Sequence, residues 1–81
     1  MQIQVLFFGA CREAVGQHEF VNEISTPSSV AQAFEDLSVK FPPLKDFGNS
    51  LLFAINEEHS RQDDLLKDGD VLAIFPPVSG G

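Results

Sequence analysis

The first hydrophobic segment of the chain, residues 3–8, has the sequence of a β-strand. Its side chains are mostly β-branched or aromatic, types that fit the half-buried surface of a sheet. Successive side chains of a strand point to opposite faces, so the expected faces are Ile3, Val5 and Phe7 on one side, and Leu6 and Phe8 on the other. Residues 10–15 then predict a helical turn ending at Gly16, and residues 19–24 predict a weaker strand.

The longest regular pattern, between Ser29 and Phe41, repeats with the period of an α-helix. Apolar residues recur at intervals of three and four positions, which places them along one stripe of a helix. The stripe consists of Val30, Ala33, Phe34, Leu37 and Phe41. Ser29 and Gln32 have the spacing of a capping box, which satisfies free backbone groups at the helix start. Pro42-Pro43 is expected to stop the helix, because proline lacks an amide hydrogen and restricts the residue before it.

Two further strands are expected in the second half of the chain, at residues 51–55 and 71–75. Segment 51–55 is apolar throughout and is interpreted as a buried strand, with room for a minor strand near His59. Asp68-Gly69 is a strong turn signal before the last strand, and Pro76-Pro77 ends that strand.

The order strand, strand, helix, strand, strand predicts an α+β fold in which one main helix packs across a mixed sheet. Because the first and last strands are both strongly apolar, we expect them to pair at the centre of the sheet. This arrangement is the β-grasp, or ubiquitin-like, fold. The expected division is a β-grasp domain over residues 1–76 and a flexible C-terminal tail over residues 77–81, ending in Gly80-Gly81.

Composition restricts what such a domain can do. The chain has 81 residues, 43 % of them hydrophobic, which suits one small domain and excludes intrinsic disorder and most self-contained enzymes. Its net charge of −7 argues against nucleic acids and anionic membranes as partners and favours basic protein surfaces. No segment predicts a membrane span or a signal peptide. The single cysteine, Cys11, fits a reducing compartment, so a cytoplasmic location is expected.

The end of the chain, Phe75 to Gly81, carries the clearest chemical signal. Two glycines without Cβ atoms make an ending narrow enough to enter another protein's active site, and the two prolines restrict the tail near the domain. A terminal carboxylate is a poor electrophile at neutral pH and must first be activated, for example by adenylation. Since the chain has no G-x-x-x-x-G-K-[ST] phosphate loop, we expect it to bind no cofactor itself and a partner enzyme to use the ATP.

Three segments are specific enough to indicate a family. They are Leu6-Phe7-Phe8 with Arg12-Glu13, the late Leu65…Asp68-Gly69-Asp70 turn, and the ending Phe75-Pro76-Pro77-Val78-Ser79-Gly80-Gly81. Together they resemble the MoaD-type small subunit of molybdopterin synthase. The resemblance implies that Gly81 is adenylated by a MoeB-type, ubiquitin-activating-like enzyme and then becomes a thiocarboxylate, with Gly80 as its small neighbour.

The same resemblance implies a second partner. The tail would enter a MoaE-type large subunit, which holds the active site, and donate sulfur to cyclic pyranopterin monophosphate in a heterotetramer of two small and two large subunits. The implied contact residues are Phe7, Phe75, Pro76, Pro77, Val78 and Ser79. Because neighbouring residues of a strand point to opposite faces, one of Phe7 and Phe8 must lie off the core face, where it could contact a partner. The alternative interpretation of each Phe is an ordinary core residue. His59 stands where relatives are expected to have an aliphatic contact residue.

Other chemistry-bearing residues are weaker candidates. Cys11 is expected to pack as a small apolar residue rather than to accept a persulfide. The acidic residues match no calcium loop, so no metal site is expected, and their suggested use is steering toward a basic enzyme. They are Glu57, Glu58, Asp63, Asp64, Asp68 and Asp70. For Arg12 and Lys67, two roles stay open: a salt bridge to a partner protein, or an ordinary surface ion pair of little energetic value.

Several alternatives to a carrier in molybdenum cofactor synthesis stay open. Similar carriers supply sulfur for thiazole synthesis or tRNA thiolation, and others are conjugated to protein lysines. A β-grasp interaction module with an incidental diglycine would have no carrier chemistry. The sulfur donor is not indicated by the sequence.

Overall fold

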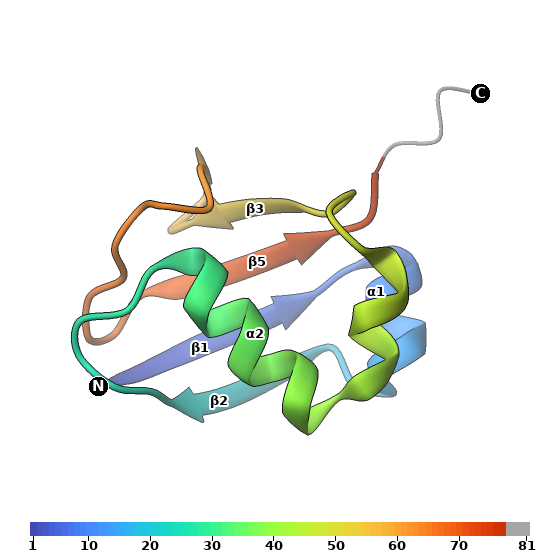
Figure 1. Cartoon of the computed structure of the whole chain (residues 1–81), viewed down its shortest axis with the longest axis horizontal. Coiled ribbons are helices and arrows are strands. Elements are labelled where there is room, and N and C mark those ends of the chain that lie inside the picture. Colours follow the sequence, from blue (N-terminus) through green and yellow to red (C-terminus); the bar gives the residue numbers. More distant parts are fainter. Residues whose placement is uncertain (78–81) are drawn as a thin grey trace.

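A mixed sheet with one main helix packed across it forms the framework of the protein (Figure 1). The computed structural model describes residues 1–77. Its elements are β1 (Gln2–Phe7), α1 (Gly9–Val15), β2 (Glu19–Glu23), α2 (Val30–Lys40), the 3₁₀-helix η1 (Pro42–Phe47), β3 (Leu52–Ile55), β4 (Glu58–Ser60) and β5 (Val71–Phe75). The strand order is β2-β1-β5-β3-β4. Only β1 and β5 pair in parallel within this sheet of the described chain, and they lie at its centre, which confirms the predicted β-grasp arrangement.

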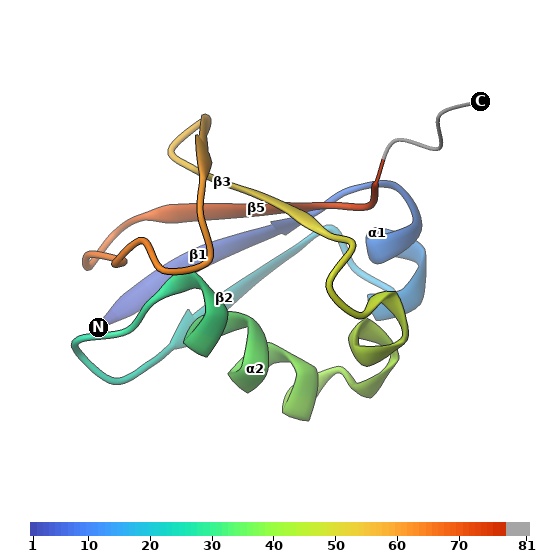
Figure 2. The same ribbon diagram turned by 45° about the horizontal axis from the view of Figure 1, so that its top comes forward.

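The two faces of the sheet differ in what covers them. Both α-helices lie on the same side of the sheet (Figure 2). The predicted grouping of the β1 side chains is confirmed, because Ile3, Val5 and Phe7 share one face and are each at most 1 % exposed. The predicted buried strand at 51–55 is buried at Leu51, Phe53 and Ala54, but Leu52 is 43 % exposed on the opposite face of the sheet. No helix of the described chain covers that face.

Helix α2 begins and ends where the sequence predicts. The Ser29 hydroxyl accepts a hydrogen bond from the Gln32 backbone N–H (3.2 Å), and the Gln32 side chain accepts one from the Ser29 N–H (2.8 Å), which confirms the capping box. The helix stops before Pro42, but the chain then continues as η1, which the sequence did not predict. Proline is compatible with the first turn of a helix, and the fully buried Leu44 holds η1 against the core.

The short helix α1 closes one end of the core. Gly16 ends it in the left-handed conformation at φ 86°, and its N–H donates to the Arg12 carbonyl, as the C-cap prediction requires. Cys11 is completely buried in this helix, which confirms its packing role. Burial raises the pKa of the Cys11 thiol, so the reactive thiolate is disfavoured.

A polar cluster that the sequence did not predict joins α2 to β2. The Asn22 side chain is 1 % exposed, and its amide donates to an Asp36 carboxylate oxygen at 3.1 Å. The Lys40 ammonium donates to the Asn22 carbonyl oxygen and lies 3.1 Å from Asp36. Hydrogen bonds from Asn22 and then from Lys40 lower the pKa of the Asp36 carboxyl below its ordinary value of 3.8.

The stability that Asp36 contributes should therefore depend on pH. Because its folded-state pKa is depressed, this contribution is fully present above the unfolded-state pKa and is lost as the pH falls below about 4. The carboxylate is 44 % exposed, so we expect Asp36→Asn to lower the free energy of unfolding by about 1 kcal/mol or less at neutral pH. Urea unfolding of both proteins measures the difference, which should shrink toward zero in strong acid. A difference that stays constant would show that the Asp36 charge contributes nothing.

Candidate partner-docking face at the base of the tail

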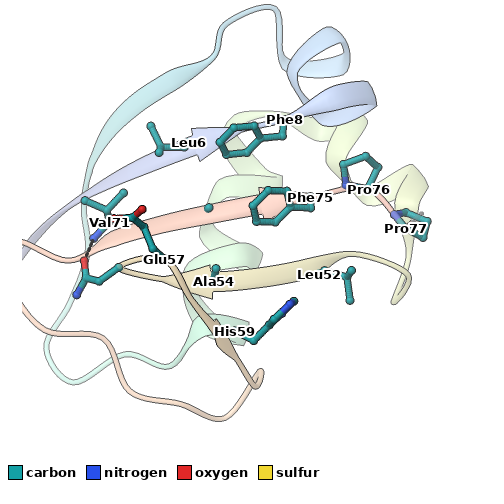
Figure 3. Close-up of a pocket in the computed structure, with 12 residues that line it drawn as sticks. Leu6, Phe8, Leu52, Ala54, Glu57, His59, Val71, Phe75, Pro76 and Pro77 are labelled. Carbon is teal, nitrogen blue, oxygen red and sulfur yellow. Dashed lines mark hydrogen bonds between the residues drawn. The ribbon is translucent and has the colours of Figure 1, made fainter. Parts of the chain in front are cut away.

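The open face of the sheet carries an apolar groove of about 1110 Å³ that runs to the end of β5 (Figure 3). Its floor contains the paired residues Ala54 and Ala73, whose short side chains leave the sheet surface low. Larger apolar side chains line the groove, among them Leu6, Phe8, Leu52 and Phe75. The groove therefore follows from small residues at the middle of two strands and large residues around them.

Three of these large residues meet at the same end of the sheet. The Phe8 backbone N–H, just past β1, donates to the Ile74 carbonyl at 3.1 Å, and Leu52 is the register partner of Phe75. The rings of Phe8 and Phe75 stack with centroids 4.7 Å apart and an interplanar angle of 10°. Phe8 is nevertheless 41 % exposed. Exposed aromatic and aliphatic side chains gathered in this way are typical of a protein interface.

The assignment of Phe7 to the partner surface is wrong. Its side chain is 1 % exposed and packs edge-on against Phe41 with ring centroids 5.8 Å apart. The parity of β1 turns Phe7 toward the helices together with Val5, and it turns Phe8 to the open face. Phe8 is therefore the β1-side residue of the groove.

The other predicted contact residues lie on or beyond the end of β5. Phe75 and Pro76 are half-buried and Pro77 is exposed, and all three line the groove. Val78 and Ser79, with the predicted reactive residues Gly80 and Gly81, lie outside the described residues. Their roles stay predictions, as does the proposed tail over 77–81.

A polar rim borders the groove on the β3–β4 side. His59 on β4 pairs in register with Ala54 and lies on this side of the groove with Leu52 (Figure 3). Glu57 follows in the β3–β4 turn, where Asn56 and Glu57 have positive φ values of 51° and 71°. The Asn56 side chain fixes this turn to β5, since it accepts from the Val71 N–H and donates to Asp70, both at 2.9 Å. The groove is thus bordered on this side by an imidazole and a carboxyl group.

Several of the acidic side chains singled out by the sequence have structural partners. Carboxylates of Asp64, Asp68 and Asp70 accept backbone N–H hydrogen bonds from Arg61, Gln2 and Lys67, respectively, at 2.8–2.9 Å.

Within residues 1–77, no three His, Cys, Asp or Glu side chains are grouped to hold a metal ion. In the same part of the chain, no helix has the length and apolar character needed to cross a membrane.

Comparison with known proteins assigns the family. A profile described as the ThiS family matches residues 5–81. The chain therefore belongs to the ThiS family. It is 37 % identical over 83 residues to the molybdopterin synthase sulfur carrier subunit of Chlamydomonas reinhardtii, with 100 % of both chains covered. This similarity confirms the resemblance that the ending and the opening strand indicated.

Solved structures extend the comparison to the fold of this ThiS-family chain. The small archaeal modifier protein 1 of Methanosarcina acetivorans is 31 % identical, with a TM-score of 0.83 over 99 % of this chain and 96 % of that one. A chain in the complex of subunits 1 and 2 of the molybdopterin-converting factor from Helicobacter pylori is 26 % identical, with a TM-score of 0.69 and 100 % of both chains covered. Both structures confirm the ubiquitin-like β-grasp fold.

Proposed function

We propose that this ThiS-family chain is the sulfur carrier subunit of a molybdopterin synthase and carries sulfur as a thiocarboxylate on Gly81. One observation supports this most strongly: the exposed Phe8 stacks on the half-buried Phe75 in an apolar groove directly at the base of the glycine-ending tail. The curated relative from Chlamydomonas, which bears the name of such a subunit, covers the chain from end to end.

The chemistry of loading begins with the carboxylate of Gly81. Attack of this carboxylate on the α-phosphate of ATP releases pyrophosphate and forms an acyl adenylate, in which AMP is a good leaving group. A sulfur nucleophile then replaces AMP and leaves a thiocarboxylate. Because the sequence has no phosphate-binding loop and only 5 Lys and Arg residues, we assign nucleotide binding to a MoeB-type activating enzyme. The chain's own contribution is a narrow, accessible terminus.

Delivery follows when the loaded chain docks on a MoaE-type large subunit. The thiocarboxylate is a better sulfur nucleophile than a carboxylate, and it gives its sulfur to cyclic pyranopterin monophosphate. The sulfur attacks a carbon of the substrate, and water then cleaves the acyl–sulfur bond, which leaves the sulfur on the substrate and returns the Gly81 carboxylate for another cycle. The net charge of −7 makes this chain a poor site for a phosphate-bearing substrate, so we assign the cations that hold the substrate to the large subunit.

The groove supplies the docking contact in this proposal. Phe8, Leu52 and Phe75 surround its tail end, so a partner seated there receives the tail at the edge of the same interface. The Helicobacter pylori relative was solved as a complex of two different subunits, which supports a one-to-one contact between small and large subunits here. Two such pairs would give the proposed heterotetramer.

A second function is favoured by one of the structural relatives. The Methanosarcina relative is named a modifier protein, and an adenylated terminal glycine can also react with a lysine amine of a target protein. The two functions share the activation step and differ in the acceptor. A chain that only modifies proteins would form isopeptide-linked conjugates and would not bind a MoaE-type subunit.

Intact-mass measurement tests the loading step. The chain is incubated with a cognate activating enzyme, ATP and a sulfide source, and we expect one oxygen of the Gly81 carboxyl to be replaced by sulfur. Fragmentation should place the change on Gly81. If the chain stays unmodified after incubation with an activating enzyme proven to be cognate, the carrier function is wrong.

A further inference from the structure

The corner between β1 and α1 touches the base of the tail at one tight contact. Gly9 follows Phe8 directly and has a φ of +55°, a conformation that side-chain-bearing residues rarely adopt. A Cβ on Gly9 would lie 2.9 Å from Cγ and 3.4 Å from Cδ of Pro76. The first distance is shorter than real Cβ contacts. Because the Pro76 ring is closed on its own backbone nitrogen, only its pucker can adjust, and any larger movement shifts the main chain.

This contact lies where the hydrogen bonds between β1 and β5 stop. The last main-chain hydrogen bond from this corner runs from the Phe8 N–H to the Ile74 carbonyl at 3.1 Å. The stacked rings of Phe8 and Phe75 hold the next residue of β5. Pro76 has no N–H with which to extend the ladder. Beyond this point no ladder hydrogen bond of the described residues fixes the direction of the chain. The direction is fixed instead by the packing of the Pro76 ring on the backbone of Gly9.

We propose that Gly9 is a positioning residue, and that its missing side chain seats the Pro76 ring and so sets the direction in which the chain leaves the domain. This inference rests on the proposed function and deepens it. An enzyme that docks on the groove receives the tail from Pro76 onward, so the direction of the chain at Pro76 decides how readily the tail reaches the enzyme's active site. A change in direction at Pro76 alters where the tail starts, while the groove keeps its other large lining residues Phe8 and Leu52.

A matched pair of glycine variants isolates the contact. Gly48 also has a positive φ, +59°, but has nothing within 4 Å of its Cβ position, so Gly48→Ala introduces a side chain at positive φ in open space. Gly9→Ala adds the clash with Pro76. We expect Gly9→Ala to lower kcat for Gly81 thiocarboxylate formation at least about tenfold with little change in KM, since small misplacements of a reacting group are costly. Gly48→Ala should stay within about twofold of wild type for the same reason.

Removal of the Pro76 ring gives a second variant, and combining it with Gly9→Ala tests whether the two residues act through their mutual contact. Pro76→Ala leaves Gly9 unstrained and should also lower kcat, because the exit direction is no longer fixed. In the double variant Gly9→Ala/Pro76→Ala, the added methyl meets no ring, so kcat should be no lower than for Pro76→Ala alone. Independent, multiplying losses in the double variant would overturn the proposal, as would equal losses from Gly9→Ala and Gly48→Ala.

A measurement on the isolated chain separates this proposal from the proposed function. NMR contacts between the Gly9 Hα and the Pro76 ring, with the ¹³C shifts of Pro76 and Pro77, report on the corner without any enzyme. Gly9→Ala should remove the contacts and move the shifts, and Gly48→Ala should do neither. If wild-type Gly81 is never thiocarboxylated, the proposed function fails while this measurement still tests the corner. Unmoved Pro76 shifts in Gly9→Ala would overturn the positioning role.

Discussion

Deletion of Gly81, or addition of one residue after it, is expected to abolish thiocarboxylate formation while leaving the domain folded. Each change moves the terminal carboxyl by about 3.5 Å along the tail, and errors of about 1 Å at a reacting centre can cost a hundredfold in rate. The loss should therefore reach at least about a hundredfold. Intact mass after reaction with the activating enzyme, ATP and sulfide measures the loaded fraction over time.

The fold provides the control for these terminal variants. The buried core extends from Ile3 to Ile74, so thermal unfolding of the deleted and extended chains should match wild type. Val39→Ala, at a position 70 % exposed on α2 and away from the groove, should load at the wild-type rate. An extended chain that still functions in the cell would instead support the interaction module with an incidental diglycine.

Phe8→Ala should mainly weaken binding of the large subunit, whereas Phe7→Ala should mainly lower the stability of the domain. Phe8 is 41 % exposed in the groove, and truncation of an interface anchor typically costs about 2 kcal/mol or more, so affinity for the large subunit should fall about 30-fold or more. Loss of its stacking on Phe75 should reduce the free energy of unfolding by only about 1 kcal/mol. Phe7 is buried, and its truncation should cost about 3–5 kcal/mol of stability.

Calorimetric titration of the large subunit and urea unfolding of each variant measure the two quantities. Val39→Ala serves again as the control and should change neither, because it is exposed on the helix side of the sheet. For Phe7→Ala, affinity is compared at a temperature where the variant is still folded. If Phe8→Ala binds the large subunit as tightly as wild type, the groove is not the docking face.

The parts of the fold that depend on residues close together in the sequence could be predicted from the sequence. The capping box at Ser29 and the C-cap at Gly16 are local interactions, and the stripe of α2 follows from helical spacing alone. Strand parity correctly separated Phe7 from Phe8. Parity could not say which of the two was buried, because that depends on which side of the sheet α2 packs.

The same dependence on tertiary packing explains the other differences. Leu52 lies in an apolar segment, yet it is exposed because the described helices cover only the other face. Asn22 had no pattern to mark it, since its role depends on Asp36 and Lys40 from a helix that lies far along the chain. Likewise, the tight approach of Gly9 to Pro76 joins opposite ends of the sequence, and only the parallel pairing of β1 with β5 brings them together.

The acidic residues illustrate a different limit. Their number sets the net charge of −7, which the composition gives directly. Their individual roles depend on turn geometry, and Asp68 accepts the Gln2 N–H across the start of the sheet. Some of the acidic residues expected to steer partners, such as Asp68, therefore also hold loops in place through hydrogen bonds to the backbone.

Single-turnover transfer of labelled sulfur tests the central claim most directly. The chain is loaded at Gly81 with a heavy sulfur isotope, purified, and mixed with the large subunit and cyclic pyranopterin monophosphate. The account predicts that the label leaves the chain and appears in the dithiolene of molybdopterin, while the intact mass of the chain returns to that of the carboxylate. Label that stays on the chain in the presence of an active large subunit, or that is lost only as the chain becomes linked to protein lysines, would contradict it.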